Sequence, residues 1–242
     1  MSEALTRKYV KSGSVDNYIK DLVSKKLSFS LRKASECTEI IMDDKHIVFA
    51  SQSNFPKKKI YLFNNVKQQV TKWLNTNDVY LPEKLSSIKY NYDYDTDKGT
   101  MCGTDLNHAY WRIAYLYGMI NEKTYIGGLD TDCKALRLAT LSVLGREKKF
   151  DNYEKGEIKE TYIYQKENVD LKNAFKFIRL TCWSIMKEVS ELLGDDFYAW
   201  KTDCIYYRES LSNIKAVQDY FDKLDLTYKQ LGYWIATQEL IV

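Results

Sequence analysis

Proline is nearly absent from this chain, and its distribution limits the possible folds more than any other feature. The 242 residues contain two prolines, Pro56 and Pro82, so none of the 160 residues after position 82 is a proline. Proline breaks the helical hydrogen-bond pattern and clashes with the preceding turn, so helices can run without interruption through this part of the chain. Apolar residues at helical spacing predict a long helix over residues 171–193, which Gly194 ends.

The segments around this helix alternate between strand and helix patterns. A short strand is expected over residues 101–106, an exposed strand or hairpin arm over 157–165, an aromatic hairpin over 197–207 and a last strand over 226–235. Further helices are expected over residues 109–120 and 210–224, together with one that begins at a cap near residues 130–131. This mixture predicts an α+β fold, in which an antiparallel sheet carries helices on one face.

The first part of the chain is a smaller and mixed α/β region. Its pattern predicts a helix over residues 15–31, strands over 40–50 and 59–63, and a helix over 65–74. The stretch 91–99 is acidic, ends in glycine and has no periodicity, which is typical of a loop. We therefore predict a domain boundary near residue 95, between an N-terminal region (1–95) and a larger domain (96–242).

Composition excludes several classes of protein. Hydrophobic residues make up 45% of the chain, which is too apolar for a disordered protein, and no apolar run is long enough to predict a membrane span. Residues 1–11 are polar and show no secretory signal. Five cysteines without a Cys-x-x-Cys pair favour neither a zinc site nor a disulfide framework. We expect a cytoplasmic protein that does not bind a membrane.

Positive charge is concentrated near the N-terminus. Residues 1–72 contain fourteen Lys and Arg against seven Asp and Glu, although the net charge of the whole chain is only +3. Such a basic region indicates attraction to a polyanion, of which nucleic acid is the commonest in a cytosol. The alternative is a lysine-rich surface that is simply solvated.

Two aspartates lie in unusual surroundings. Asp105 comes at the end of the predicted strand 101–106, and Asp203 lies between the two aromatic arms of the hairpin 197–207. Burying a carboxylate there costs several kcal/mol unless cations or hydrogen-bond donors compensate. Two carboxylates on adjacent strands can hold a pair of Mg²⁺ ions about 4 Å apart, an arrangement that serves phosphoryl transfer. The alternative for each aspartate is a cap or a turn residue.

Three segments extend this pattern along the chain. They are Asp105–Trp111, Arg137–Gly145 and Ala199–Cys204, and the predicted long helix separates the second from the third. In this order they resemble the three palm motifs of family B DNA polymerases, including phage enzymes. The family motifs are Asp-x-x-Ser-Leu-Tyr-Pro, Lys-x-x-x-Asn-Ser-x-Tyr-Gly and Tyr-Gly-Asp-Thr-Asp-Ser. The resemblance covers roughly residues 100–240.

The motifs are retained in part. The first keeps its Asp and its Tyr as Asp105 and Tyr110. The second keeps a basic residue at Arg137, together with its Ser and Gly, but leucines replace its Asn and Tyr. The third keeps its second aspartate as Asp203, whereas Lys201 stands in place of the first. A primer-contacting Lys-Lys-x-Tyr segment of the family has a faint counterpart that begins at Lys229.

The resemblance implies a role for each of these residues. Asp105 and Asp203 are the implied catalytic residues and ligands of two Mg²⁺ ions. Arg137, with Lys134 one turn earlier, is implied to face the triphosphate, and Tyr110 to lie beneath the incoming sugar. The alternatives are a solvated helix residue for Arg137 and a core residue for Tyr110. Lys229 is implied to contact the nucleic acid.

The resemblance also has limits that bear on function. The chain has no room for the proofreading exonuclease and the thumb of this family, so a partner protein or the basic N-terminal region would supply the grip on duplex DNA. We therefore expect a reduced, family-B-like DNA polymerase or nucleotidyltransferase that binds a primer-template and nucleoside triphosphates. One alternative is a catalytically degenerate palm-derived protein that binds nucleic acid or a replication partner. Another is a structural protein without a nucleic-acid role.

Overall fold

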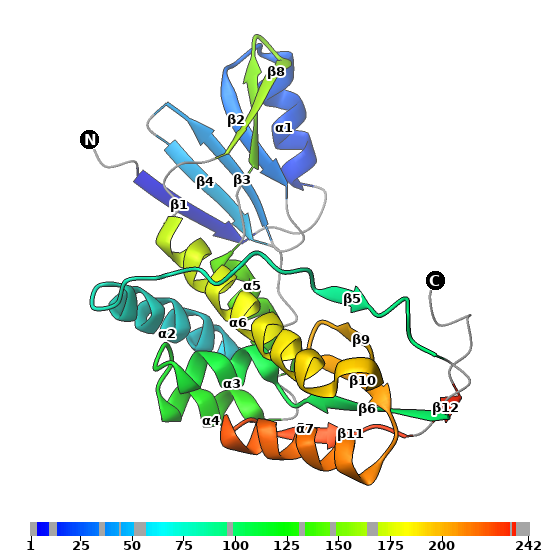
Figure 1. Cartoon of the computed structure of the whole chain (residues 1–242). Coiled ribbons are helices and arrows are strands. Elements are labelled where there is room, and N and C mark those ends of the chain that lie inside the picture. Colours follow the sequence, from blue (N-terminus) through cyan, green and yellow to red (C-terminus); the bar gives the residue numbers. More distant parts are fainter. Residues whose placement is uncertain are drawn as a thin grey trace. The chain divides into compact units, whose positions relative to one another are not determined.

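The chain folds into two compact α+β units, whose elements are labelled in Figure 1. The computed structural model describes residues 4–9, 14–33, 37–43, 45–50, 57–95, 99–130, 134–145, 149–163, 169–232 and 234–235. The first unit comprises Met1–Tyr61 and Arg146–Val169, and the second comprises Leu62–Gly145 and Asp170–Val242. The α+β fold class predicted from the sequence is confirmed.

The first unit is built on a six-stranded sheet with the order β1-β4-β3-β2-β7-β8. Strands β1 and β4 are parallel, and the other neighbouring strands are antiparallel. Helix α1 (Ser14–Ser24) buries Ile19 and Leu22 against the apolar side chains of the strands. The strands are β1 (Ala4–Tyr9), β2 (Phe29–Lys33), β3 (Cys37–Met42), β4 (Lys45–Ala50), β7 (Lys149–Glu154) and β8 (Glu157–Ile163).

The two units divide the chain at places other than residue 95. The β7–β8 hairpin lies far along the sequence, yet it joins the N-terminal sheet because β7 pairs with β2. The predicted boundary near residue 95 falls inside the second unit. A boundary drawn from local composition cannot detect this return, because pairing between distant strands leaves no local signal.

Two local predictions for the first part of the chain are wrong. Residues 59–63, predicted as a strand, belong to helix α2 (Lys57–Leu74), in which Leu62, Val66 and Val70 recur every four residues and are buried. The helix predicted over residues 15–31 ends at Ser24, and Phe29–Lys33 form β2 instead. Lys26, with a φ of 53°, takes the left-handed conformation that commonly ends a helix.

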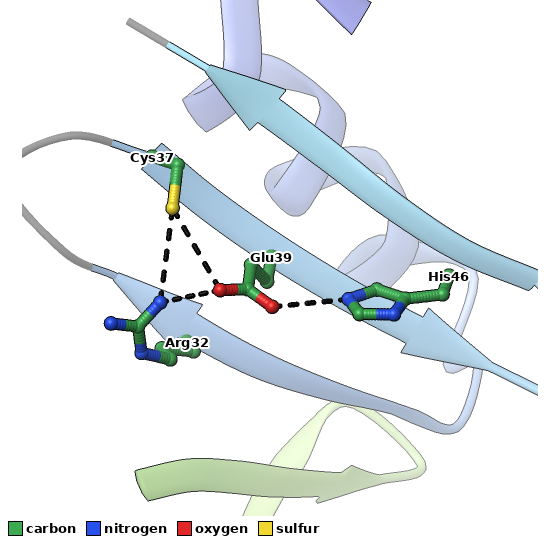
Figure 2. A network of polar contacts seen from close by, with 4 residues as sticks. All are labelled: Arg32, Cys37, Glu39 and His46. Carbon is green, nitrogen blue, oxygen red and sulfur yellow. Dashed lines mark hydrogen bonds and ion pairs between the residues drawn. The ribbon is translucent and has the colours of Figure 1, made fainter. Parts of the chain in front are cut away.

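A charged network is buried in the first unit, on strands β2, β3 and β4 (Figure 2). The guanidinium of Arg32 lies 2.5 Å from a carboxylate oxygen of Glu39, and these side chains are 9% and 5% exposed. The second carboxylate oxygen of Glu39 lies 3.1 Å from Nε2 of His46. The Cys37 sulfur lies within 4 Å of both Arg32 and Glu39. Arg32 and Glu39 are directly opposite each other in the sheet, which brings the two charges together.

The second unit contains an antiparallel sheet with the order β11-β6-β10-β9-β5, and β12 also pairs with β6. Along the chain, β6, α6, β9, β10, α7 and β11 form a split β-α-β-β-α-β arrangement. Its strands are β5 (Ile88–Tyr90), β6 (Thr100–Leu106), β9 (Phe197–Lys201), β10 (Cys204–Arg208), β11 (Tyr228–Gln230) and β12 (Trp234–Ile235). Its helices, besides α2, are α3 (Ala109–Leu116), α4 (Glu122–Leu129), α5 (Lys134–Leu144), α6 (Val169–Leu193) and α7 (Leu211–Lys223).

The two faces of this sheet have different neighbours. On one face, Leu106, Ile205 and Tyr207 pack into a large core with residues of α2 to α7. On the other face, a small cluster around Met101 and Tyr198 contains side chains of strands and of the segment before β6. The helices therefore cover one face, as predicted. The cap predicted at residues 130–131 lies partly outside the described residues, and α5 begins at Lys134.

Gly128 allows α4 to pack closely against α3. A Cβ atom at this position would lie 2.4 Å from the ring of Trp111, whose indole N–H donates a hydrogen bond to the carbonyl of Tyr125. We expect Gly128→Ala to lower the free energy of unfolding by about 1–3 kcal/mol, because the ring must move out of a packed core. Urea denaturation measures this change. Gly232→Ala, where the added atom meets open space, is the control, and equal effects would contradict the prediction.

Within these described ranges, no helix combines the length and the apolar character that crossing a bilayer requires.

Candidate active site

Asp105 lies near the end of β6, between two strands that each contribute a neighbour. Its register partners are Cys204 on β10 and Lys229 on β11. The Lys229 ammonium lies 2.9 Å from a carboxylate oxygen of Asp105, and the Asp105 side chain is 26% exposed. This carboxylate is therefore partly accessible and already has a cation beside it.

Asp203 lies in the two-residue turn between β9 and β10, directly beside Asp105. The turn is closed by the pairing of Lys201 with Cys204. The carbonyl of Asp203 accepts a hydrogen bond of 3.0 Å from the N–H of Leu106, so the turn is joined to the residue that follows Asp105. Thr202 has a φ of 59°, which is uncommon for a β-branched residue and indicates local strain. The structure thus brings both predicted carboxylates to one end of the sheet, Asp105 on β6 and Asp203 in the β9–β10 turn.

The negative charge of Asp105 acts on the carboxyl group of Asp203. Burial, together with the negative charge of Asp105, raises the pKa of Asp203 from 3.8 to about 6. Its own backbone N–H and the positive charges of Lys229 and Lys134 act in the opposite direction on this pKa but do not cancel the effect. An added cation would therefore stabilise the ionised form of Asp203.

The donor set suits a hard divalent cation. Carboxylate oxygens are the ligands that Mg²⁺ prefers, and Mg²⁺ is commonly bound by one or two carboxylates together with substrate phosphates and water. Among the described residues, no group of three or more His, Cys, Asp and Glu side chains is arranged to hold a metal ion. A cation at Asp105 and Asp203 would thus complete its coordination with oxygens of a bound substrate and of water.

Arg137 is placed differently from the expected triphosphate-facing residue. It is 4% exposed, and its guanidinium donates to the carbonyls of Gly128 and Asp130 and to Nδ1 of His108, the last at 2.9 Å. It is therefore neither a solvated helix residue nor directed into solvent. Lys134, at the start of α5, is exposed, and its charge influences the pKa values of both Asp203 and His108.

Tyr110 belongs both to the core and to the surroundings of the site. Its half-buried ring packs against the large core of the second unit. Burial raises the pKa of its hydroxyl to about 12, and the charges of Cys182 and Asp203 contribute. The hydroxyl is therefore neutral near pH 7. The two interpretations drawn from the sequence, a core residue and a site residue, are compatible for this side chain.

Arg179 on α6 is a residue of this region that the sequence analysis missed. Its guanidinium lies 4.6 Å from the centre of the Trp183 ring, and its charge acts on the hydroxyl of Tyr110. One turn further along α6, the Cys182 sulfur contacts the carbonyl of Thr202 beneath the Asp203 turn. The four-residue spacing of Arg179 and Trp183 on a predicted helix could have indicated this contact, because residues four apart lie on the same face of a helix.

Comparisons with protein-family models, with curated proteins and with solved structures found no match to this chain. The resemblance to a polymerase palm therefore rests on the sequence motifs alone and stays a prediction.

Proposed function

We propose that the second unit is a nucleotidyltransferase site that extends a nucleic-acid primer by Mg²⁺-dependent phosphoryl transfer. The observation that carries this proposal is the pair Asp105 and Asp203, which lie 98 positions apart in the sequence but come together on β6 and in the β9–β10 turn, where the charge of Asp105 helps to raise the pKa of Asp203. The order β6, α6, β9–β10 and α7 also agrees with the succession of elements that the palm resemblance implies.

In this proposal, the carboxylates of Asp105 and Asp203 would hold Mg²⁺, which when bound would supply activation of the primer 3′-hydroxyl and stabilisation of charge on the triphosphate. The position of the ion would be set by the strand that carries Asp105 and by the turn that carries Asp203. Lys134 supplies positive charge to the triphosphate side of the site. The neutral hydroxyl and ring of Tyr110 would lie beneath the incoming sugar and exclude a 2′-hydroxyl.

Primer extension tests the proposal directly. The whole chain is incubated with a primed DNA template, the four deoxynucleoside triphosphates and either Mg²⁺ or Mn²⁺. We expect addition of nucleotides to the primer, and Asp105→Asn should prevent it. Absence of extension with both cations would overturn the proposal. A partner protein that replaces the thumb, or the basic N-terminal region, would mainly raise the length of product made in each binding event.

A second candidate function has support from particular residues. Lys229 neutralises Asp105, and Lys201, in place of an aspartate, lies over the ring of Tyr90 at 5.6 Å. These cations favour a protein that binds nucleic acid without catalysis. In that case DNA affinity should fall steeply between 50 and 200 mM salt, and no extension should occur. An affinity that does not change with salt would exclude this function.

Removal of Lys229 should strengthen binding of a divalent cation. In the structure its ammonium occupies one carboxylate oxygen of Asp105, so a metal ion must compete with it. We expect Lys229→Met to bind Mn²⁺ about 2- to 5-fold more tightly than the unaltered chain, measured by isothermal titration calorimetry. Lys215→Met, which removes an exposed lysine on α7, is the control for net charge. Equal tightening in both variants would contradict a specific role for Lys229.

A further inference from the structure

His108 connects the strand of Asp105 to helix α3 in an unusual conformation. Its backbone is left-handed, with a φ of 56° and a ψ of 37°. It is the residue at the N-cap position of α3, but its side chain makes no capping hydrogen bond. His108 is exposed, so its imidazole is not part of the core, and it does not cap the start of the helix.

Arg137 determines which nitrogen of this imidazole carries the proton. A terminal nitrogen of the guanidinium lies 2.9 Å from Nδ1 of His108. Because a guanidinium can only donate, Nδ1 must accept, and the proton of the neutral ring is then on Nε2. Burial and the charges of Arg137 and Lys134 lower the pKa of His108, which keeps the ring neutral near pH 7. His108 thus presents one N–H donor, at Nε2.

Arg137, which holds this imidazole, also contacts other helices. Arg137 also binds the carbonyls of Gly128 and Asp130 at the end of α4, so one buried side chain joins α3, α4 and α5. Within the described ranges, Nε2 of His108 makes no hydrogen bond to another residue. A protonated Nε2 cannot ligate a metal ion, but it can donate to an anion, and the charge of Lys134 acts on the same ring.

We infer that His108 donates a hydrogen bond from Nε2 to a phosphate group of the nucleoside triphosphate, and that Arg137 is the positioning residue that orients the imidazole. This inference rests on the proposed function, and it assigns the triphosphate contact to His108 and Lys134 instead of Arg137. His108 lies three residues after Asp105, so the phosphate would be bound next to the carboxylate pair.

Two variants of His108 separate a donor from a structural residue. His108→Gln keeps an N–H donor near the position of Nε2, whereas His108→Leu removes it. The dissociation constant of a deoxynucleoside triphosphate is measured by calorimetry with Mn²⁺, and KM is measured in primer extension. We expect His108→Leu to weaken binding about 10- to 100-fold and His108→Gln to stay within about 5-fold of the unaltered chain. Unchanged binding in His108→Leu, or an equal loss in both variants, would overturn the inference.

The tautomer can be measured without reference to activity. The chain has two histidines, so ¹⁵N-histidine NMR spectra show two imidazoles, and the His108→Gln spectrum identifies the signals of His108. We expect the neutral form with the proton on Nε2 at pH 7.5, and a shift toward the other tautomer in Arg137→Met, which has no donor to offer Nδ1. A proton on Nδ1 in the unaltered chain, or an unchanged tautomer in a folded Arg137→Met variant, would refute the role of Arg137.

The outcomes distinguish the inference from the function on which it rests. Triphosphate binding that is absent from the unaltered chain, together with absence of extension, removes the proposed function. If the unaltered chain extends primers and His108→Leu binds the triphosphate as tightly as the unaltered chain, the inference about His108 is wrong but the proposed function stands.

Discussion

Replacement of Asp203 by asparagine is expected to abolish primer extension and at the same time to stabilise the fold at neutral pH. Loss of a carboxylate that binds Mg²⁺ should lower the extension rate by at least about 1000-fold, because several kcal/mol of transition-state stabilisation are lost. Asparagine has nearly the same shape, so Asp203→Asn leaves the turn and its hydrogen bond to Leu106 in place. DNA affinity should change little.

The gain in stability follows from the raised pKa of Asp203. The folded-state pKa is about 6, against an ordinary value of 3.8, so between these pH values the folded chain binds more protons than the unfolded chain. The free energy of unfolding therefore falls as pH rises through this window, and the full cost of ionising Asp203 is present above about pH 6. For this partly exposed residue the cost is on the order of 1–2 kcal/mol.

Urea denaturation at several pH values tests this prediction. Asp203→Asn should be about 1–2 kcal/mol more stable than the unaltered chain at pH 7.5, and the difference should shrink toward pH 4. Asp195→Asn, in the exposed turn after α6, is the control. A variant that still extends primers would refute the metal assignment. A variant that is less stable than the unaltered chain at pH 7.5 would refute an unfavourable ionisation of Asp203 in the folded chain.

The second large effect is expected in the first unit, at the buried pair of Arg32 and Glu39 (Figure 2). Arg32→Met leaves the Glu39 carboxylate buried without its guanidinium, and the free energy of unfolding should fall by about 3–5 kcal/mol. The double variant with Arg32→Met and Glu39→Met removes both charges and should recover much of this loss. Urea denaturation of the single and double variants measures both changes.

A neighbouring ion pair provides the matched control. Lys33, next to Arg32 in β2, pairs with Asp16 at 2.9 Å, but these side chains are 59% and 62% exposed. Lys33→Met should therefore change stability by less than about 1 kcal/mol. Similar losses in the free energy of unfolding for Arg32→Met and Lys33→Met would show that burial does not determine how much an ion pair contributes to stability in this unit. A double variant as unstable as Arg32→Met would show that the loss comes from packing and not from burial of the Glu39 charge without the guanidinium.

Local patterns predicted much of the second unit. The apolar spacing of residues 171–193 and the glycine after them specify α6, and the aromatic hairpin over 197–207 corresponds to β9 and β10. The last strand, predicted over 226–235, is found as the two short strands β11 and β12. These elements could be predicted because each depends on side chains close together in the sequence.

The order of the three palm-like motifs predicted that Asp105 and Asp203 come together, and the structure places them on β6 and in the adjoining β9–β10 turn. The sequence also determined the α+β class, because helix and strand periods alternate along a chain nearly free of proline. The tertiary structure alone decided that β7 returns to β2 and that Arg137 is buried against His108 and the end of α4. The hydrogen-bond acceptors of a helix cation depend on how the helices pack. For Arg137 they are two main-chain carbonyls and a ring nitrogen, and no periodicity in the sequence predicts these contacts.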